Sequence, residues 1–241
     1  MIQVRNLTKR FGDICAVNDV SFKIENSSVV GFLGPNGAGK STTIRLMSGV
    51  LRPDIGTAKI CGHDITTEEL QAQNCFGYLP EAAGGFGILT VREFLTYCGE
   101  CRGMWGDTLI RAIEKTAELV ELGPALNEEM KKLSKGWRQR AWLAQAILHD
   151  PLVLILDEPT DGLDPNQKDK INDLIRQKRV NKTIILSTHI LEEVEEVCDR
   201  VLLIANGCIV ADGTPENLIY EFGSLPKAFK TLTTKESFQR H

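Results

Sequence analysis

The chain has 241 residues, of which 42% are hydrophobic and 25% charged, and its formal net charge is −4. These values are close to the average for globular proteins and exclude a disordered, collagen-like or fibrous chain. The mild acidity also argues against nucleic acid as a main partner, because phosphate binding by charge needs a basic surface.

The first part of the chain predicts antiparallel strands and then a buried core strand. Apolar residues alternate with polar ones over residues 1–30, which indicates an antiparallel opening. Val29–Leu33 is almost wholly apolar, as expected of a strand buried on both faces. A glycine-rich turn and a segment with helical spacing (41–47) follow, and residues 57–60 and 75–79 predict further strands.

The pattern then changes to helical spacing over residues 91–149, with no strand-like run inside this block. Such a block predicts a helical insertion in an α/β core. Strands are expected again at 152–156 and 183–186, with a helix of mixed polarity at 166–178 between them. Two apolar runs around Asn206-Gly207, in residues 200–212, predict a β-hairpin.

The sequence shows no membrane span or signal peptide. No stretch reaches the roughly 18 apolar residues that cross a bilayer, and the start has no apolar run of signal-peptide length. We therefore expect a cytosolic chain that would need a partner for any membrane role.

Seven cysteines, an odd number, favour reduced thiols over a disulfide framework. Cys98 and Cys101 form a C-x-x-C pair, which is compatible with a redox or metal site. We favour two small apolar residues one helical turn apart, because a second such pair is absent from the sequence.

The turn after Val29–Leu33 carries a phosphate-binding pattern, G-x-x-x-x-G-K-S/T. Its glycines let backbone N–H groups turn toward phosphate oxygens, and the N-terminus of the following helix adds positive charge. Lys40 supplies a charge for the β- and γ-phosphates, and the Ser41 hydroxyl can bind Mg²⁺. The full motif is Gly34-Pro35-Asn36-Gly37-Ala38-Gly39-Lys40-Ser41, and it predicts a P-loop that binds a nucleoside triphosphate.

Two carboxylates, Asp157 and Glu158, end the next buried strand. Ligands collect at such strand ends in open α/β sheets, and successive strand side chains point to opposite sides, so the two acids should differ in role. Asp157 is expected to hold the water shell of Mg²⁺, and Glu158 to act as general base for an attacking water. His189 also follows a buried strand, and it is either structural or placed to contact the γ-phosphate or the water.

Residues 133–140, Leu-Ser-Lys-Gly-Trp-Arg-Gln-Arg, resemble the LSGGQ signature of ATP-binding cassette (ABC) ATPases. The other motifs of that family follow in order over residues 2–222. Gly34 to Thr42 resembles Walker A, residues 152–158 resemble Walker B, residues 161–164 resemble the D-loop, His189 occupies the position of the switch histidine, and Phe11 occupies that of an aromatic that stacks on adenine.

The resemblance implies an α/β fold with a P-loop NTPase core, an N-terminal antiparallel β-subdomain and an inserted helical subdomain. Residues 1–223 would form one ATPase domain, with the helical subdomain at about 85–150, and residues 224–241 a tail or short helix. Members of the family pair head to tail around two ATP molecules. Ser134 and Gly136 would then contact the γ-phosphate bound to the partner chain, and Asp164 would cross the interface.

The chain departs from the family at the Q-loop, where Glu81 replaces glutamine. Glu81 can still accept from Mg²⁺-bound water, but an ionised carboxylate donates no hydrogen bond. Lys135 and Trp137 also replace signature residues, and we expect activity to survive. The variants Gly-Tyr-Leu-Pro-Glu (77–81), Leu-Ser-Lys-Gly (133–136) and Gly-Leu-Asp-Pro (162–165) together resemble exporter-type (ABC-2-like) cassettes.

We therefore expect a bacterial Mg²⁺-dependent ATPase that drives separate transmembrane permease subunits, bound peripherally at the cytoplasmic face of the membrane. The Q-loop and residues 91–104 would receive the permease. ATP binding would join two copies, or this chain and another cassette.

Three other functions are compatible with parts of the sequence. A soluble ABC ATPase of DNA repair or translation usually has two cassettes or a long coiled coil, and neither is present. A non-hydrolysing switch would be favoured by loss of Glu158 or His189. A GTPase would need aspartate at Ile184, after Asn181-Lys182-Thr183. Near the C-terminus, residues 228–232 are compatible with a short helix that packs on a neighbour, and we favour a surface helix with a frayed, basic end.

Overall fold

The computed structural model describes residues 1–81 and 84–234 of the chain. One of its two sheets has four antiparallel strands in the order β2-β1-β4-β5. These strands are β1 (Ile2–Phe11), β2 (Ile14–Ile24), β4 (Ile55–Ile60) and β5 (His63–Asp64). The antiparallel opening predicted from the sequence is confirmed.

The second sheet forms the core and has six strands in the order β10-β9-β3-β8-β7-β6. Neighbouring strands from β9 to β6 are parallel, and β10 is antiparallel to β9. The strands are β3 (Val29–Leu33), β6 (Phe76–Leu79), β7 (Val153–Asp157), β8 (Thr183–Thr188), β9 (Arg200–Ala205) and β10 (Cys208–Gly213). Asn206 and Gly207 both have positive φ, 50° and 78°, as a tight hairpin turn requires, and the predicted hairpin is confirmed.

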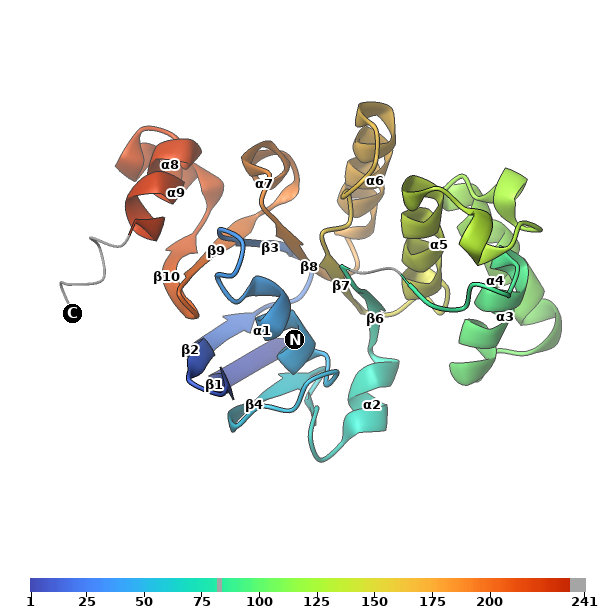
Figure 1. Ribbon diagram of the computed structural model, residues 1–241, viewed down its shortest axis with the longest axis horizontal. Coiled ribbons are helices and arrows are strands. Elements are labelled where there is room, and N and C mark those ends of the chain that lie inside the picture. Colours follow the sequence, from blue (N-terminus) through green and yellow to red (C-terminus); the bar gives the residue numbers. More distant parts are fainter. Residues whose placement is uncertain (82–83, 235–241) are drawn as a thin grey trace.

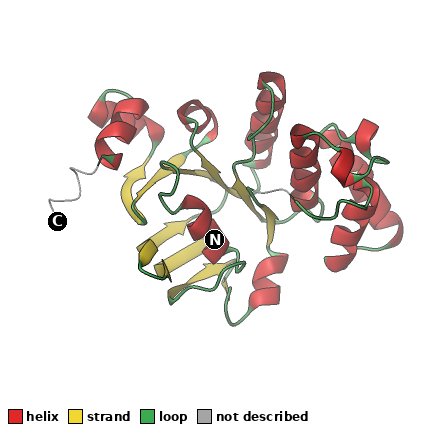
Figure 2. Cartoon of the chain, in the orientation of Figure 1, coloured by secondary structure: helices red, strands yellow, loops and turns green. Residues whose placement is uncertain are grey.

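Alternating residues of the core strands enter two different apolar clusters. Leu154 and Leu156 of β7 face a cluster built mainly with helices, whereas Val153 and Ile155 face a cluster shared with the antiparallel sheet and α1 (Lys40–Met47). Both faces of the core sheet are therefore covered, which explains why its strands are continuous apolar runs. Figure 2 shows the two sheets and the helices around them.

Three helices, α3 (Val91–Cys101), α4 (Gly106–Leu119) and α5 (Lys135–Ile147), lie between β6 and β7 in the chain and gather at one end of the molecule (Figure 1). Helices α8 (Pro215–Phe222) and α9 (Leu225–Thr233) lie at the other end. The remaining helices are α2 (Glu69–Asn74), α6 (Pro165–Lys178) and α7 (Leu191–Val197), with short 3₁₀ turns at Gly123–Ala125 and Met130–Lys132.

Helix α5 joins the helical block to the core sheet by direct contact with β6. A Cβ atom on Gly77 would lie 1.7 Å from the Ala146 carbonyl oxygen, so only glycine allows this approach. The Gln145 side chain also donates a hydrogen bond of 2.6 Å to the Tyr78 carbonyl. The end of α5 and the strand that leads into Glu81 are thus held together.

Helix α9 lies at the surface with its polar face exposed, and its apolar face packs on the core. Leu225 and Ala228 are fully buried and belong to the same apolar cluster as the core strands. Phe229 and Leu232 pack against that cluster too, so the apolar residues form one stripe at helical spacing that the rest of the fold covers. Residues 235–241 lie outside the described part.

No helix in the described ranges combines the length and the apolar character that crossing a bilayer would require.

Candidate functional site

The P-loop connects β3 to α1 and encloses a phosphate-sized space with its backbone. Gly37 and Gly39 have φ of 77° and 108°, and a Cβ on Gly39 would lie 2.6 Å from the Ala16 carbonyl oxygen. Glycine is therefore required there by both conformation and space. The loop lines a cavity of about 340 Å³ whose walls are Asn36 to Thr42 together with Ala16, Arg45, Glu81 and Glu158.

Lys40 begins α1, and its side chain folds back across the loop. Its Nζ donates hydrogen bonds to the carbonyl oxygens of Gly34 (2.8 Å) and Pro35 (3.3 Å). Burial lowers the pKa of the Lys40 ammonium, and the carboxylates of Glu158 and Asp157 oppose that shift. The ammonium is therefore a poorly hydrated charge beside the cavity, which strengthens its attraction to phosphate.

Asp157 is fully buried at the end of β7 and faces Ser41. The Ser187 hydroxyl donates to its Oδ1, and the Ser41 hydroxyl lies 3.2 Å from the same atom and 3.1 Å from Oε2 of Glu81. Burial raises the pKa of Asp157, and the Ser187 hydrogen bond offsets part of the rise. Within the described chain, Oδ2 of Asp157 is buried and has no hydrogen-bond partner.

Glu158 leaves the strand instead of continuing it. β7 ends at Asp157, and Glu158 has a left-handed φ of 51°. The turn therefore sets the direction of the Glu158 side chain. The strand alternation that was expected from the sequence to separate Asp157 from Glu158 does not apply here. Its amide donates to the Ser187 carbonyl (3.2 Å), and its carbonyl accepts from Gln139 of α5 (3.0 Å).

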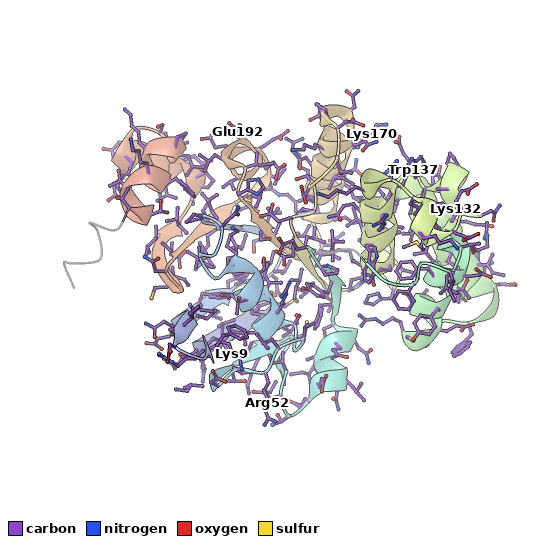
Figure 3. All side chains as sticks on the ribbon, in the orientation of Figure 1. Lys9, Arg52, Lys132, Trp137, Lys170 and Glu192 are labelled. Carbon is purple, nitrogen blue, oxygen red and sulfur yellow. The ribbon has the colours of Figure 1, made fainter. Side chains whose placement is uncertain are left out.

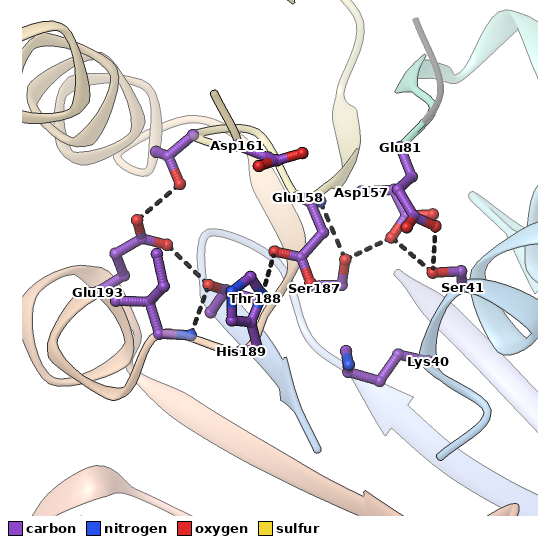
Figure 4. A network of polar contacts seen from close by, with 12 residues as sticks. Lys40, Ser41, Glu81, Asp157, Glu158, Asp161, Ser187, Thr188, His189 and Glu193 are labelled. Carbon is purple, nitrogen blue, oxygen red and sulfur yellow. Dashed lines mark hydrogen bonds and ion pairs between the residues drawn. The ribbon is translucent and has the colours of Figure 1, made fainter. Parts of the chain in front are cut away.

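The Glu158 carboxylate contacts His189, which follows β8. Nδ1 of His189 lies 3.0 Å from Oε2 of Glu158, while the imidazole is half exposed (Figure 4). Burial raises the pKa of Glu158, and the His189 hydrogen bond acts in the opposite direction. A carboxylate with a raised pKa is a stronger base, so this pair is suited to take a proton from water.

The signature residues lie apart from this cavity in the same chain. Ser134 caps α5 by accepting from the Trp137 amide (3.3 Å), and Lys135 pairs with Asp161 at 2.7 Å. A Cβ on Gly136 would lie 3.1 Å from the Gln167 side chain. Asp164 caps α6 by accepting from the Gln167 amide (3.0 Å). These residues pack on one another, and none of them is among the described residues that line the P-loop cavity.

Phe11 lies at the tip of the hairpin between β1 and β2, where it pairs with Ile14. Its side chain is 50% exposed, and the Lys9 ammonium lies 5.9 Å from the ring centre. Among the described residues, those that line the cavity include Ala16 of β2 but not Phe11. Lys9, beside Phe11, and Trp137 of the signature lie on opposite sides of the molecule (Figure 3).

Several residues at the site were missed from the sequence. Ser187 and Gln139 hold Asp157 and the Glu158 backbone, and Arg45 lines the cavity. The spacing of Arg45, one helical turn after Ser41, could have indicated it. Glu193 is one of four glutamates in α7, and no local pattern distinguishes it.

These motifs and this fold are those of a nucleotide-binding ATPase, and comparison with known proteins gives its class. The sequence model of the ABC transporter family matches residues 17–161, and the chain belongs to that family. It is an ABC transporter ATP-binding subunit and an ATPase, as the sequence predicted.

Two relatives carry specific names. Nod factor export ATP-binding protein I of Burkholderia lata is 37% identical over 219 residues, which cover 90% of this chain and 72% of that protein. The probable multidrug ABC transporter ATP-binding protein YbhF of Escherichia coli is 35% identical over 222 residues, which cover 90% of this chain and 38% of that protein.

Solved structures confirm the fold class. The ATP-binding subunit of an ABC transporter superposes with a TM-score of 0.89 at 29% identity, covering 97% of this chain and all of that one. A dimeric ATP-binding cassette bound to ADP and phosphate has a TM-score of 0.82 at 23% identity, covering 89% of this chain and 98% of that one.

The GTPase alternative fails on position as well as on family. Lys182, of the segment that resembles N-K-x-D, is buried, bonds to the Pro151 carbonyl and pairs with Asp150 at 2.8 Å. Lys182 therefore forms contacts at the start of β8, at the edge of the core sheet opposite the P-loop.

Proposed function

We propose that this chain hydrolyses ATP with Mg²⁺ at the P-loop cavity. Gly34 to Thr42 would hold the phosphates, and Ser41, Asp157 and Glu81 would hold the ion. The observation that carries this proposal is the Oδ2 atom of Asp157, buried without a hydrogen-bond partner beside the Ser41 hydroxyl. A buried carboxylate oxygen needs a partner, and a hard cation fits that need.

The protein would supply few ligands to the ion, as is usual for Mg²⁺, which keeps several waters and phosphate oxygens in its coordination shell. Among the described residues, no group of three or more His, Cys, Asp or Glu side chains could hold a metal. Two carboxylates and one hydroxyl would leave positions for phosphate oxygens and water. Bound there, Mg²⁺ would neutralise charge on the β- and γ-phosphates.

The chain's own groups would carry out the remaining steps. Lys40 and the loop amides would hold the γ-phosphate, and Glu158 would take the proton of the attacking water. His189 would hold the Glu158 carboxylate through its Nδ1, which lies 3.0 Å away, and its other ring nitrogen would be free to contact the γ-phosphate or the water. The buried site would keep these charges poorly hydrated and therefore effective.

We further propose that two copies, or this chain and a second cassette, enclose each ATP. Ser134, Gly136 and Asp164 lie apart from the cavity of their own chain, which supports a role toward the nucleotide of a partner. The start of α5 at Lys135 offers backbone N–H groups and a positive dipole to a γ-phosphate. The named relatives support an export role.

The membrane would be reached through permease subunits on the cytoplasmic face. Apolar side chains near the Q-loop and α3 are exposed, namely Ile88, Tyr97 and Trp105, and they would meet the permease. We propose residues 1–223 as one ATPase domain with a helical subdomain at about 85–150, and α9 packs on the core of that domain. The acidic net charge of −4 gives no support to a nucleic-acid partner.

Light scattering on the Glu158→Gln variant with Mg²⁺ and excess ATP tests the enclosure. The mass should rise from 26.7 kDa to about twice that value only with ATP, because unhydrolysed nucleotide holds two chains together. The Glu158→Gln, Ser134→Arg double variant is the control, and it should stay monomeric. A monomer that binds ATP would overturn pairing of two free copies.

Replacing Glu81 with glutamine should change ATP affinity by less than about threefold. The amide keeps an oxygen that can accept from Mg²⁺-bound water, and phosphates supply most of the negative charge around the ion. Titration calorimetry with Mg²⁺-ATP measures the change. A large loss of affinity would mean that the carboxylate has a role specific to this subclass.

Replacing Phe11 with alanine should weaken ATP binding by about 1–3 kcal/mol if the ring stacks on adenine. Equilibrium binding of ATP measures the loss, and GTP serves as a comparison because every base has a π-face. Ile14→Ala, on the paired residue of the same hairpin, is the matched control. Unchanged affinity in Phe11→Ala would make the ring a surface residue without a nucleotide role.

A further inference from the structure

We propose that Glu193 is a positioning residue that sets the contact between His189 and Glu158. The inference rests on the catalytic roles proposed above for that pair. Glu193 lies on α7 and is 5% exposed. It is outside the set of described residues that line the P-loop cavity, so it would act through other residues.

The Glu193 carboxylate bridges two segments of the chain with its two oxygens. Oε1 accepts a hydrogen bond of 2.6 Å from the Thr160 hydroxyl, and Oε2 accepts one of 2.8 Å from the Thr188 hydroxyl. Both bonds are buried, and Figure 4 shows the carboxylate beside Thr188. The Thr188 oxygen in turn accepts from the Ile190 amide (3.1 Å).

The bridged residues flank the proposed catalytic pair. Thr160 lies two residues after Glu158, and Thr188 immediately precedes His189. One carboxylate therefore joins the turn after β7 to the last residue of β8, which leads directly into His189. By fixing the separation of these two segments, the bridge would keep Nδ1 of His189 at its 3.0 Å distance from the Glu158 carboxylate.

The energetics argue against a purely structural role. Burying a carboxylate is costly unless it is paired and hydrogen-bonded, and an apolar side chain of similar volume would fill the space at lower cost. The nearest cation, Lys168, is 3.9 Å from Oε1 and is partly exposed. The charge is thus stabilised chiefly by the two threonine hydroxyls, which are the groups that tie the catalytic turns together.

Glutamine at this position tests the bridge with little change of shape. Its carbonyl oxygen can accept from one threonine, but its NH₂ group can only donate, so the other hydroxyl must turn and accept, and both bonds lose the charge of the carboxylate that strengthens them. Glu192→Gln is the matched control, because it removes one charge from the next residue of the same helix at an exposed position (Figure 3).

Steady-state hydrolysis by Glu193→Gln should show kcat lowered by about 10- to 100-fold, as misplaced catalytic groups do. The KM for ATP should stay within about twofold, because Glu193 does not reach the cavity. Glu192→Gln should match the unmodified chain. In a His189→Ala background, adding Glu193→Gln should cause less than about a twofold further loss, since the residue it positions is gone.

Thr160→Val and Thr160→Ser keep the test decisive if Glu193→Gln folds poorly. Valine removes one arm of the bridge and should lower kcat, whereas serine keeps the hydroxyl and should restore it. An unchanged kcat in Glu193→Gln or Thr160→Val would overturn the inference. A full further loss in the His189→Ala background would also overturn it, because it would indicate a structural role.

The outcomes separate this inference from the proposed function. If Glu158→Gln retains hydrolysis, the proposed roles of the catalytic pair fail. If Glu158→Gln is inactive while Glu193→Gln keeps its kcat, only the positioning role fails.

Discussion

Glu158→Gln should lower kcat for ATP hydrolysis by about 10²- to 10⁴-fold, the contribution typical of a general base. The amide cannot take a proton from water, but it can keep a hydrogen bond with Nδ1 of His189, which lies 3.0 Å from the carboxylate. Binding of ATP should persist, because the phosphates are held by the P-loop. Phosphate release and equilibrium binding, measured on the same preparation, check both parts.

The control for this variant is Glu195→Gln, an exposed glutamate of α7 outside the site. It should hydrolyse ATP at the unmodified rate. Full activity in Glu158→Gln would mean that another group takes the proton, and Glu158 would then have only a structural place in the turn after β7.

Lys40→Ala should weaken ATP binding by about 2–5 kcal/mol, the cost of truncating one partner of a buried charge pair. This is a loss of about 30-fold or more in Kd. The ammonium is buried within the P-loop, so exposed lysines cannot replace it. Equilibrium binding of Mg²⁺-ATP measures the effect.

Lys59→Ala is the matched control, since it removes an exposed charge from β4. It should leave Kd nearly unchanged. An unchanged affinity in Lys40→Ala would exclude Lys40 from the nucleotide site and leave it as a buried cap of the Gly34 and Pro35 carbonyls.

The sequence predicted the core strands well because burial on both faces leaves a simple pattern. Leu154 and Ile155 face different clusters, yet both must be apolar. The apolar run therefore indicates a buried strand even when the strands that pair with it are unknown. The order of strands in the sheet was not predicted, because pairing between distant segments leaves no local signal. The same limit applied to α9, whose apolar stripe did not reveal that the core would cover it.

At the site, residues within a motif could be predicted and residues that support them could not. Lys40 and Glu158 have fixed spacing from a glycine turn or a strand end, and both line the P-loop cavity. Ser187 and Gln139 act across more than 15 residues of chain, through bonds that only folding creates.

Helix α5 is hydrogen-bonded to two other parts of the chain, once near its middle and once near its end. Gln139 donates a hydrogen bond to the Glu158 carbonyl, and Gln145 donates one to the Tyr78 carbonyl on the strand that leads to Glu81. Ser134 caps the start of the helix. At 1.5 Å per residue, Ser134 lies about 7.5 Å and Gln145 about 9 Å along the helix axis from Gln139. A tilt of the helix about Gln139 would therefore move its Ser134 end and its Tyr78 end in opposite directions. The signature residues, the turn that holds Glu158 and the strand that leads to Glu81 are in this way connected through one helix.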